Sequence, residues 1–289
     1  MWAVAKDVEY STGDLLYKYF KCLNCDVLFI FPVPYDVLKD IYPNEYYSYN
    51  KGQSLFIGAV KSFCDKVFFR SICKGFKNKN LKALDVGGGV GAELTALRSA
   101  DKRFAFTQII DLNENAKLIA ENAGHNYFCG KLEDFTVSHK FDLILMLNLI
   151  EHVWNPAVIL QKARDLLAEN GIILLKTPNF RSLDSFLFKN KNWAGYHCPR
   201  HWVIFNDKSF FAFANQNQLN VKDFSFTQGA PFWAASILAN MPLCKDVIKK
   251  PLYQFKAFPF LCLFFGAFDS LRKVFFKTSQ MFIILNKSS

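Results

Sequence analysis

Histidine is the side chain best suited to take up a proton near neutral pH, and this chain has five. His152 follows the apolar run "FDLILMLN" and comes directly after Glu151, whereas His201 lies in the stretch "WAGYHCPRHWVIFN". Because both follow expected strands, we predict that His152, His201 and Glu151 face a bound substrate and take part in catalysis. A purely structural hydrogen bond is the alternative for each histidine. His125 and His139 fall in connecting segments and are predicted to be surface residues.

Further polar and aromatic residues follow the same expected strands and are predicted to contact the substrate. Trp193, His197 and Arg200 share the stretch that contains His201, and Asn179 ends the run "GIILLKTPN". The planar guanidinium of Arg200 would suit a phosphate or a carboxylate, because its donors match two oxygens at once.

A glycine loop, "LDVGGGVGAEL", separates an apolar run from a helical pattern and could bind a cofactor. Its spacing fits both G-x-G-x-x-A, the dinucleotide fingerprint, and D-x-G-x-G-x-G, formed by Asp85, Gly87, Gly89 and Gly91. Glycine allows the backbone to approach a ligand closely, and the following helix attracts negative charge. Asp111 ends the next apolar run, where a carboxylate can accept both hydroxyls of a ribose. The loop and Asp111 leave both cofactor types open.

The elements that must position these residues alternate along the chain from residue 81 to about 230. Expected strands are "KALDV", "FTQIID", "NYFCG", "FDLILMLN", "GIILLKTP" and "VKDFSFT", with "QMFIILNK" near the end of the chain. Expected helices cover residues 92–100, 113–123, 156–168 and 207–218, and an amphipathic helix is expected between 54 and 80. Strands that alternate with helices predict crossover connections and a mostly parallel sheet.

The ordered motifs "D-x-G-x-G-x-G", "FD-(x8)-EHV" and "NG-x-ILLKTPN" resemble those of class I S-adenosylmethionine (SAM)-dependent methyltransferases. The branch that they resemble includes the ubiquinone-biosynthesis O-methyltransferases and many methyltransferases of bacterial glycan pathways. This resemblance covers residues 81 to about 228. It implies an α/β fold with a Rossmann-like seven-stranded sheet, mostly parallel with an antiparallel last strand, and helices on both faces. N-terminal and C-terminal helical additions are expected around it.

The same resemblance implies SAM as the cofactor, with S-adenosylhomocysteine (SAH) as its product. By position, it assigns the methionine part to Gly87, Gly89 and Gly91 with Asp85 and Asn148 beside it, the ribose to Asp111, and the adenine to Leu132 and Glu133. From the residues alone, Leu132 could cover the adenine ring and Glu133 could accept a hydrogen bond from its amine.

Two patterns raise the question of a metal, and we predict none at either. Some methyltransferases bind a divalent ion with E-x-x-E-H and a later histidine, but here Asn148 replaces the first carboxylate before Glu151 and His152. Cys22-x-x-Cys25 resembles the second half of a zinc ribbon. A structural zinc wants four ligands, and the chain has no other C-x-x-C, so a remnant ribbon with reduced thiols is expected.

The aromatic segment 231–278 has apolar runs bordered by lysines, which fits either a lid packed on the domain or a peripheral contact with a membrane surface. Its longest apolar run has 12 residues, fewer than the roughly 20 that span a bilayer. The chain shows no signal segment, so we expect a cytoplasmic protein, with peripheral membrane binding left open. The net charge of +10 favours an anionic partner, of which nucleic acid is the least expected because no nucleic-acid module is present.

The expected organisation is a ribbon-like segment 1–50, a helical segment 51–80 and a SAM-binding domain 81–289 with an insertion at 231–278. The predicted function is O-methylation of a sugar, a lipid-linked glycan or another small hydroxyl acceptor. One alternative is an NAD-dependent oxidoreductase, although no Tyr-x-x-x-Lys lies on an expected helix. A catalytically inactive SAM-binding protein is the other.

Overall fold

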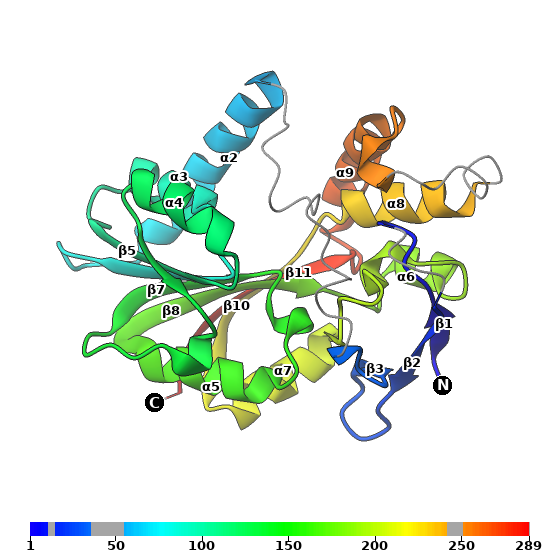
Figure 1. The fold of residues 1–289 in the computed structure, drawn as a ribbon, viewed down its shortest axis with the longest axis horizontal. Coiled ribbons are helices and arrows are strands. Elements are labelled where there is room, and N and C mark those ends of the chain that lie inside the picture. Colours follow the sequence, from blue (N-terminus) through cyan, green and yellow to red (C-terminus); the bar gives the residue numbers. More distant parts are fainter. Residues whose placement is uncertain (11–14, 36–54, 242–250, 289) are drawn as a thin grey trace.

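A seven-stranded sheet in the order β10-β11-β8-β7-β4-β5-β6 runs through the centre of the molecule (Figure 1). The computed structural model describes residues 1–10, 15–35, 55–241 and 251–288. The strands are β4 (Lys82–Val86), β5 (Phe106–Asp111), β6 (Asn126–Cys129), β7 (Phe141–Leu147), β8 (Leu167–Pro178), β10 (Leu219–Thr227) and β11 (Gln280–Lys287). Strands β4 to β8 pair in parallel, and β11 lies antiparallel between β8 and β10. The predicted fold class is confirmed.

Helices cover both faces of this sheet, as predicted (Figure 1). They include α2 (Leu55–Cys73), α3 (Ala92–Ala100), α4 (Glu114–Asn122), α5 (Pro156–Leu166) and α7 (Asp207–Gln216). Neighbouring strand residues alternate between two apolar cores: Leu143 packs with residues of α2 and α3, whereas Ile144 packs with residues of α5 and α7. Asparagine caps start α5 and α7, where Asn155 and Asn206 accept hydrogen bonds from Val158 N and Ser209 N.

The N-terminal helical addition is present as α2, and the described residues before it form a small antiparallel sheet in the part of the chain predicted to be ribbon-like. Its strands, in the order β1-β2-β3-β9, are β1 (Ala3–Ala5), β2 (Tyr17–Lys21), β3 (Leu28–Phe31) and β9 (Val203–Ile204). Burial alternates along these strands, because Tyr19, Leu28 and Ile30 face one core with Trp193 and Tyr196. Through β9, this sheet is joined to the segment that carries His201.

The C-terminal addition is helical, as predicted, and lies between the last two strands in sequence. It contains α8 (Ala230–Asn240), the short η7 (Leu252–Gln254) and α9 (Phe258–Arg272). Helices α8 and α9 lie side by side (Figure 1), with Trp233 of α8 stacked on Phe265 of α9 at 4.7 Å between ring centroids. Within the described residues, no helix has the length and apolar character needed to cross a membrane.

Candidate functional site

The glycine loop follows the carboxyl end of β4 and leads into α3, with three glycines in the left-handed region. The φ angles of Gly87, Gly89 and Gly91 are +78°, +50° and +79°, which residues with a Cβ rarely adopt. A Cβ on Gly91 would lie 2.7 Å from Cδ2 of His125, so packing also requires glycine there. A Cβ on Gly89 would meet no atom within 4 Å. The loop is therefore packed below Gly91 and open at Gly89, where a ligand can approach the backbone.

Asp111 lies half-buried at the carboxyl end of β5 and is bonded to the glycine loop. Its Oδ2 accepts a hydrogen bond from Gly89 N at 2.8 Å, and its Oδ1 accepts one from Asn113 N at 2.9 Å. The carboxylate thus lies beside the open part of the loop, at the position expected for ribose binding. Its role toward a ribose stays a prediction.

Asp85 is a buried carboxyl group below the same loop, with 3% of its surface exposed. Its Oδ2 has no hydrogen-bond partner among the described residues. Burial raises the pKa of Asp85 well above its usual range, and the carboxylates of Glu93 and Asp111 raise it further. A Cβ on Gly88 would lie only 2.6 Å from Oδ2, so the carboxyl group touches the loop. This unsatisfied acceptor fits a ligand that brings a donor or a positive charge to the loop.

The residues predicted to hold the adenine lie in different surroundings. Leu132 begins the short helix η3 (Leu132–Asp134) and is 2% exposed in the core beside Ile110 and Phe135. Its side chain packs in the core, and its contact with an adenine ring stays a prediction. Glu133 is exposed, and its contact with adenine also stays a prediction.

Asn148 follows β7 in a left-handed conformation, with φ of +55°. Its backbone N donates to Lys176 O at 2.8 Å, and its Oδ1 accepts from Gln280 Nε2 at 3.3 Å. This turn directs the chain from β7 into the short helix η4 (Ile150–His152). Leu149, between β7 and η4, lies against the glycine loop, because a Cβ on Gly87 would be 3.2 Å from Cδ1 of Leu149. The segment after β7 thus touches the glycine loop.

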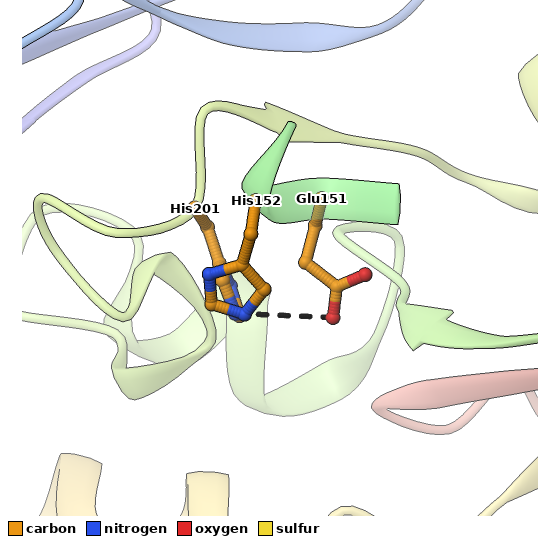
Figure 2. Close-up of side chains that lie close together, drawn as sticks. All are labelled: Glu151, His152 and His201. Carbon is orange, nitrogen blue, oxygen red and sulfur yellow. Dashed lines mark ion pairs between the residues drawn. The ribbon is translucent and has the colours of Figure 1, made fainter. Parts of the chain in front are cut away.

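Glu151, His152 and His201 come together at this edge of the sheet (Figure 2). The first two belong to η4, and His201 comes from the segment between the short helix η5 (Ala194–Tyr196) and β9. The ring centroids of His152 and His201 are 4.6 Å apart, and His201 Nε2 lies 3.9 Å from Glu151 Oε1. Sequence reasoning selected these three residues, and the structure brings them together.

Burial controls the protonation of this cluster. It raises the pKa of Glu151 to about 8, and Glu151 Oε1 has no hydrogen-bond partner among the described residues. Burial also lowers the pKa of His152 to about 3, with further lowering by the positive charges of His197 and Arg200. Burial also lowers the pKa of His201 well below its usual range. At neutral pH both histidines are neutral, and Glu151 is largely protonated.

Hydrogen bonds orient the members of the cluster. His201 Nδ1 lies 2.8 Å from the carbonyl oxygen of Gly195, so this nitrogen carries the proton and Nε2 faces Glu151. Glu151 Oε2 accepts from Thr177 Oγ1 at 3.0 Å, at the end of β8. His152 is hydrogen-bonded to the backbone of Arg200 and is half-buried, whereas His201 is 4% exposed. His152 is therefore the more accessible of the two bases.

The cluster also has the donor set of a metal site. One ligand atom from each of Glu151, His152 and His201 lies within 4.8 Å of the others, so the three could hold a divalent ion. Asn148 stands where the motif of metal-binding methyltransferases has a further carboxylate. Its side-chain oxygen accepts a hydrogen bond from Gln280. The prediction that no metal is bound has not been tested and stays a prediction.

Two carboxylates of the N-terminal segment bind residues next to the cluster, and the sequence analysis identified neither of them. Asp7 Oδ2 accepts from Arg200 Nη2 at 2.8 Å, with 2% and 0% of the two side chains exposed. Glu9 Oε2 lies 2.9 Å from His197 Nδ1. Each pair joins residues more than 180 positions apart, a separation at which no sequence pattern announces a contact. The guanidinium of Arg200 is buried against Asp7, and its predicted contact with substrate stays a prediction.

Three other predicted substrate contacts are buried structural residues. Asn179 is fully buried and donates from Nδ2 to Thr278 O at 2.9 Å. Trp193 is 1% exposed and donates from Nε1 to Asp184 Oδ2 at 2.7 Å. His197 is 6% exposed, and its ring centroid lies 5.0 Å from that of His201. The fold already uses the polar atoms of Asn179 and Trp193 and buries His197, and direct substrate contact by these side chains stays a prediction.

His125 also differs from its prediction as a surface residue. It is 3% exposed, and its two ring nitrogens lie 2.9 Å and 2.8 Å from the hydroxyl oxygens of Thr95 and Thr107. Its ring fills the space below Gly91. The prediction failed because the close approach of α3 to β5 buries a connecting segment. His139 is partly buried against Phe106 and not fully at the surface.

Cys22 and Cys25 form the turn between β2 and β3, where Cys22 N donates to Val27 O at 2.9 Å. Both are free thiols, and Cys25 is exposed. Hydrogen bonds from Cys25 and neighbouring backbone lower the pKa of Cys22, while burial raises that of Cys25. The interpretation of this turn as a remnant zinc ribbon and the absence of zinc from it both stay predictions.

Comparison with known proteins gives one matching family model, described as a methyltransferase domain, over residues 61–222. A ubiquinone biosynthesis O-methyltransferase of Glaesserella parasuis serovar 5 (strain SH0165) is 32% identical over 110 residues, or 34% of this chain and 45% of that protein. The protein of the same name from Neisseria meningitidis serogroup C (strain 053442) is 34% identical over 109 residues, covering 34% and 44%. The matches thus span less than half of these relatives.

Among solved structures, the plantazolicin methyltransferase BamL, in complex with a triazolic desmethylPZN analog and SAH, has a similar fold. The TM-score is 0.52 at 16% sequence identity, and the similarity covers 80% of this chain and 85% of that chain. The low identity limits the comparison to the fold.

Proposed function

This chain belongs to the class I SAM-dependent methyltransferases, and we propose that it transfers the methyl group of SAM to a hydroxyl group of a small or lipid-linked acceptor. One observation carries the proposal: the open glycine loop and the histidine cluster lie at the same edge of the sheet. Leu149 contacts Gly87 and is only three residues before His152, so the donor loop and the base are neighbours.

The donor side of the site is formed by the glycine loop and the two carboxylates next to it. SAM, when bound, supplies an activated methyl group on its sulfonium. Gly89 leaves the backbone open to the methionine part, Asp85 offers a buried acceptor below it, and Asp111 would bind the ribose hydroxyls. To bind the ribose hydroxyls, the Asp111 carboxylate shares or gives up the hydrogen bond that it accepts from Gly89 N. These residues mainly fix the position of the donor, because alignment of acceptor and methyl carbon is a large part of the rate enhancement.

We propose His152 as the base that removes the acceptor proton. A neutral imidazole is required, and burial keeps the pKa of His152 at about 3, so the ring is unprotonated at neutral pH. The proton passes from the acceptor hydroxyl to the ring nitrogen that does not bond the Arg200 backbone. Glu151 and His201 act as positioning residues behind it, with Thr177 fixing the Glu151 carboxyl group.

The acceptor class rests on the chemistry of the base and on the relatives. A histidine base suits a hydroxyl group, and the relatives in this comparison are named ubiquinone biosynthesis O-methyltransferases. We therefore propose a prenylated ring, a sugar or a lipid-linked glycan as the acceptor. Proton transfer by the cluster needs no ion, and Asn148 in place of a carboxylate weakens ion binding. We propose that the enzyme acts without a metal.

The direct test is methyl transfer from SAM to a panel of phenolic, sugar and lipid-linked hydroxyl compounds, with SAH formation and product mass as readouts. The expected result is SAH formation that depends on one acceptor class and persists in EDTA. Tight SAH binding without turnover on any hydroxyl acceptor would contradict O-methylation while leaving the cofactor assignment intact. Loss of activity in EDTA, restored by one divalent ion, would overturn metal-free catalysis.

A further inference from the structure

The outer face of α9 exposes an unusual amount of apolar surface. Phe260, Leu263 and Phe264 are 72%, 74% and 66% exposed, and Leu271 is 77% exposed. Their spacing of three, four and seven residues puts them on one side of the helix. The chain then continues through Val274, Phe275 and Phe276, all of which are more than 60% exposed. We define Phe260, Leu263, Phe264 and Leu271 as the α9 outer face.

The opposite side of α9 is fixed firmly to the protein, so the outer face is held in position. Phe265 stacks on Trp233, and Asp269 is fully buried. The Asp269 carboxylate accepts hydrogen bonds from Gly229 N at 3.1 Å and Trp233 Nε1 at 3.2 Å, and it pairs with Arg272. The fold therefore anchors α9 through one face and leaves the other without an intramolecular use among the described residues.

The charges around the outer face are positive. Lys256 precedes α9 and Lys273 follows it, and both side chains are exposed. The only acidic residue between 251 and 277 is Asp269, whose carboxylate is buried and hydrogen-bonded on the other side. The outer face thus combines apolar surface with cations and no exposed anion. A chain with a net charge of +10 adds long-range attraction to an anionic surface.

The length of α9 determines how it can meet a bilayer. Its 15 residues are about 22 Å long, shorter than the roughly 30 Å hydrocarbon core, so the helix does not span. Helices with an apolar face and flanking lysines lie in the plane of the interface, with their apolar side chains among the acyl chains. We propose that the α9 outer face binds the surface of an anionic phospholipid bilayer, with Lys256 and Lys273 at the headgroups.

A second copy of the chain fits this face less well. A twofold interface through the outer face would bring Lys256 and Lys273 of one copy toward the same cations of the other, with no exposed carboxylate between 251 and 277 to compensate them. An anionic lipid surface supplies the missing negative charge. The inference goes beyond methyl transfer, because bilayer binding requires neither SAM nor the histidine cluster.

The test is sedimentation of the full chain with vesicles of phosphatidylcholine alone or mixed with phosphatidylglycerol. The triple variant Phe260→Ser, Leu263→Ser and Phe264→Ser removes apolar contacts, and Leu118→Ser on α4 is the matched control, since Leu118 is 68% exposed elsewhere. The expected results are binding to the mixed vesicles, a loss of at least about tenfold in the triple variant, and no change in the control. Neutralising Lys256 or Lys273 to Gln should weaken binding about fivefold each.

Each variant is also checked for its melting temperature and SAH affinity, which should match those of the wild type. Equal vesicle binding by the triple variant and the wild type would overturn the inference, as would failure of the wild type to bind anionic vesicles. A dimer in solution that the triple variant converts to a monomer would assign the face to a second copy instead. Vesicle binding is measured without SAM, so failure of the proposed methyl transfer would not affect this result.

Discussion

The donor side and the acceptor side of the site lie at one edge of the sheet but are built in different ways. The donor side comes from one stretch of chain, β4 with its glycine loop, together with Asp111 at the end of the next strand. The acceptor side is assembled from η4, the segment around His201 and the N-terminal carboxylates. The donor side is therefore local and defined by backbone conformation, whereas the acceptor side depends on distant contacts. This difference predicts that the two sides can be damaged separately.

The largest expected effect is on turnover. Replacing His152 by Ala should lower kcat by a factor of about 10² to 10⁴, the usual contribution of a positioned base. SAH affinity should stay within about twofold, because the donor side is untouched. His201→Ala should have a smaller effect on kcat, since His201 is buried behind His152. Transfer assays and SAH titrations of the two variants check this order.

A purely structural His152 would give a different pattern. The His152→Ala variant would then melt at a lower temperature, and its activity would fall only in proportion to the folded fraction. Full activity in both histidine variants would eliminate base catalysis by this cluster.

The next effect concerns the long-range support of the acceptor side. Asp7→Asn leaves the buried Arg200 guanidinium without its counter-charge and should cost about 3–5 kcal/mol of unfolding free energy. Glu9→Gln is the matched control, because it also replaces a carboxylate by its amide, but the Glu9 side chain is 19% exposed and that of Asp7 only 2%. Denaturant unfolding of both variants measures the difference. A loss of stability in Asp7→Asn no greater than in Glu9→Gln would contradict the importance assigned to the buried pair.

Two glycine substitutions separate packing from ligand access on the donor side. Gly91→Ala adds strain at a positive φ and a Cβ 2.7 Å from His125, so it should cost about 2–5 kcal/mol of stability. Gly89→Ala adds similar strain but no clash, so it should cost only about 1–2 kcal/mol. Its methyl group nevertheless points into the ligand space and should weaken SAH binding at least about tenfold. Equal stability losses with unchanged SAH affinity would refute this division.

The last expected effect is a pH dependence of stability. The folded-state pKa of Glu151 is raised to about 8, so the native state binds a proton that the unfolded state releases above its usual value of 4.5. The stabilising contribution is complete below about pH 4.5 and is lost as the pH rises to about 8. The variant Glu151→Gln keeps the neutral form and lacks this dependence. Between pH 5 and pH 8 the wild type should therefore lose several degrees of melting temperature relative to the variant.

His152 acts in the opposite direction and is present in both proteins. Its folded-state pKa lies below the ordinary value of 6.5, so its contribution to stability grows as the pH rises from about 3 to 6.5. The difference between the two melting curves isolates Glu151. Parallel curves for the wild type and Glu151→Gln across this range would contradict a protonated Glu151.

The sheet and the donor side could be predicted because their signals are local. Period-two and helical patterns gave β4, β5 and β7 to within one residue, and the glycine spacing identified the three left-handed positions. The N-terminal sheet could not be predicted as a unit, because β9 comes from more than 170 residues later in the chain. Its pairing is set by packing of Tyr19 and Leu28 against distant aromatic residues, which no local pattern records.

The candidate site divides in the same way. His152 and Glu151 were identified because they directly follow a strand. The partners of Arg200 and Trp193 could not be predicted from the sequence. Nothing in the sequence indicates that Asp7 neutralises Arg200. Asp184, the partner of Trp193, belongs to a helix whose orientation depends on the whole fold.

The measurement that tests the central claim most directly is calorimetric titration of SAH into the wild type, Asp111→Ala and His152→Ala, with NAD as the competing ligand. The account predicts one SAH per chain, no NAD binding, a much weaker affinity in Asp111→Ala and an unchanged affinity in His152→Ala. Binding of NAD, or SAH affinity that is lost in His152→Ala and retained in Asp111→Ala, would contradict a donor side formed by the glycine loop and independent of the acceptor side.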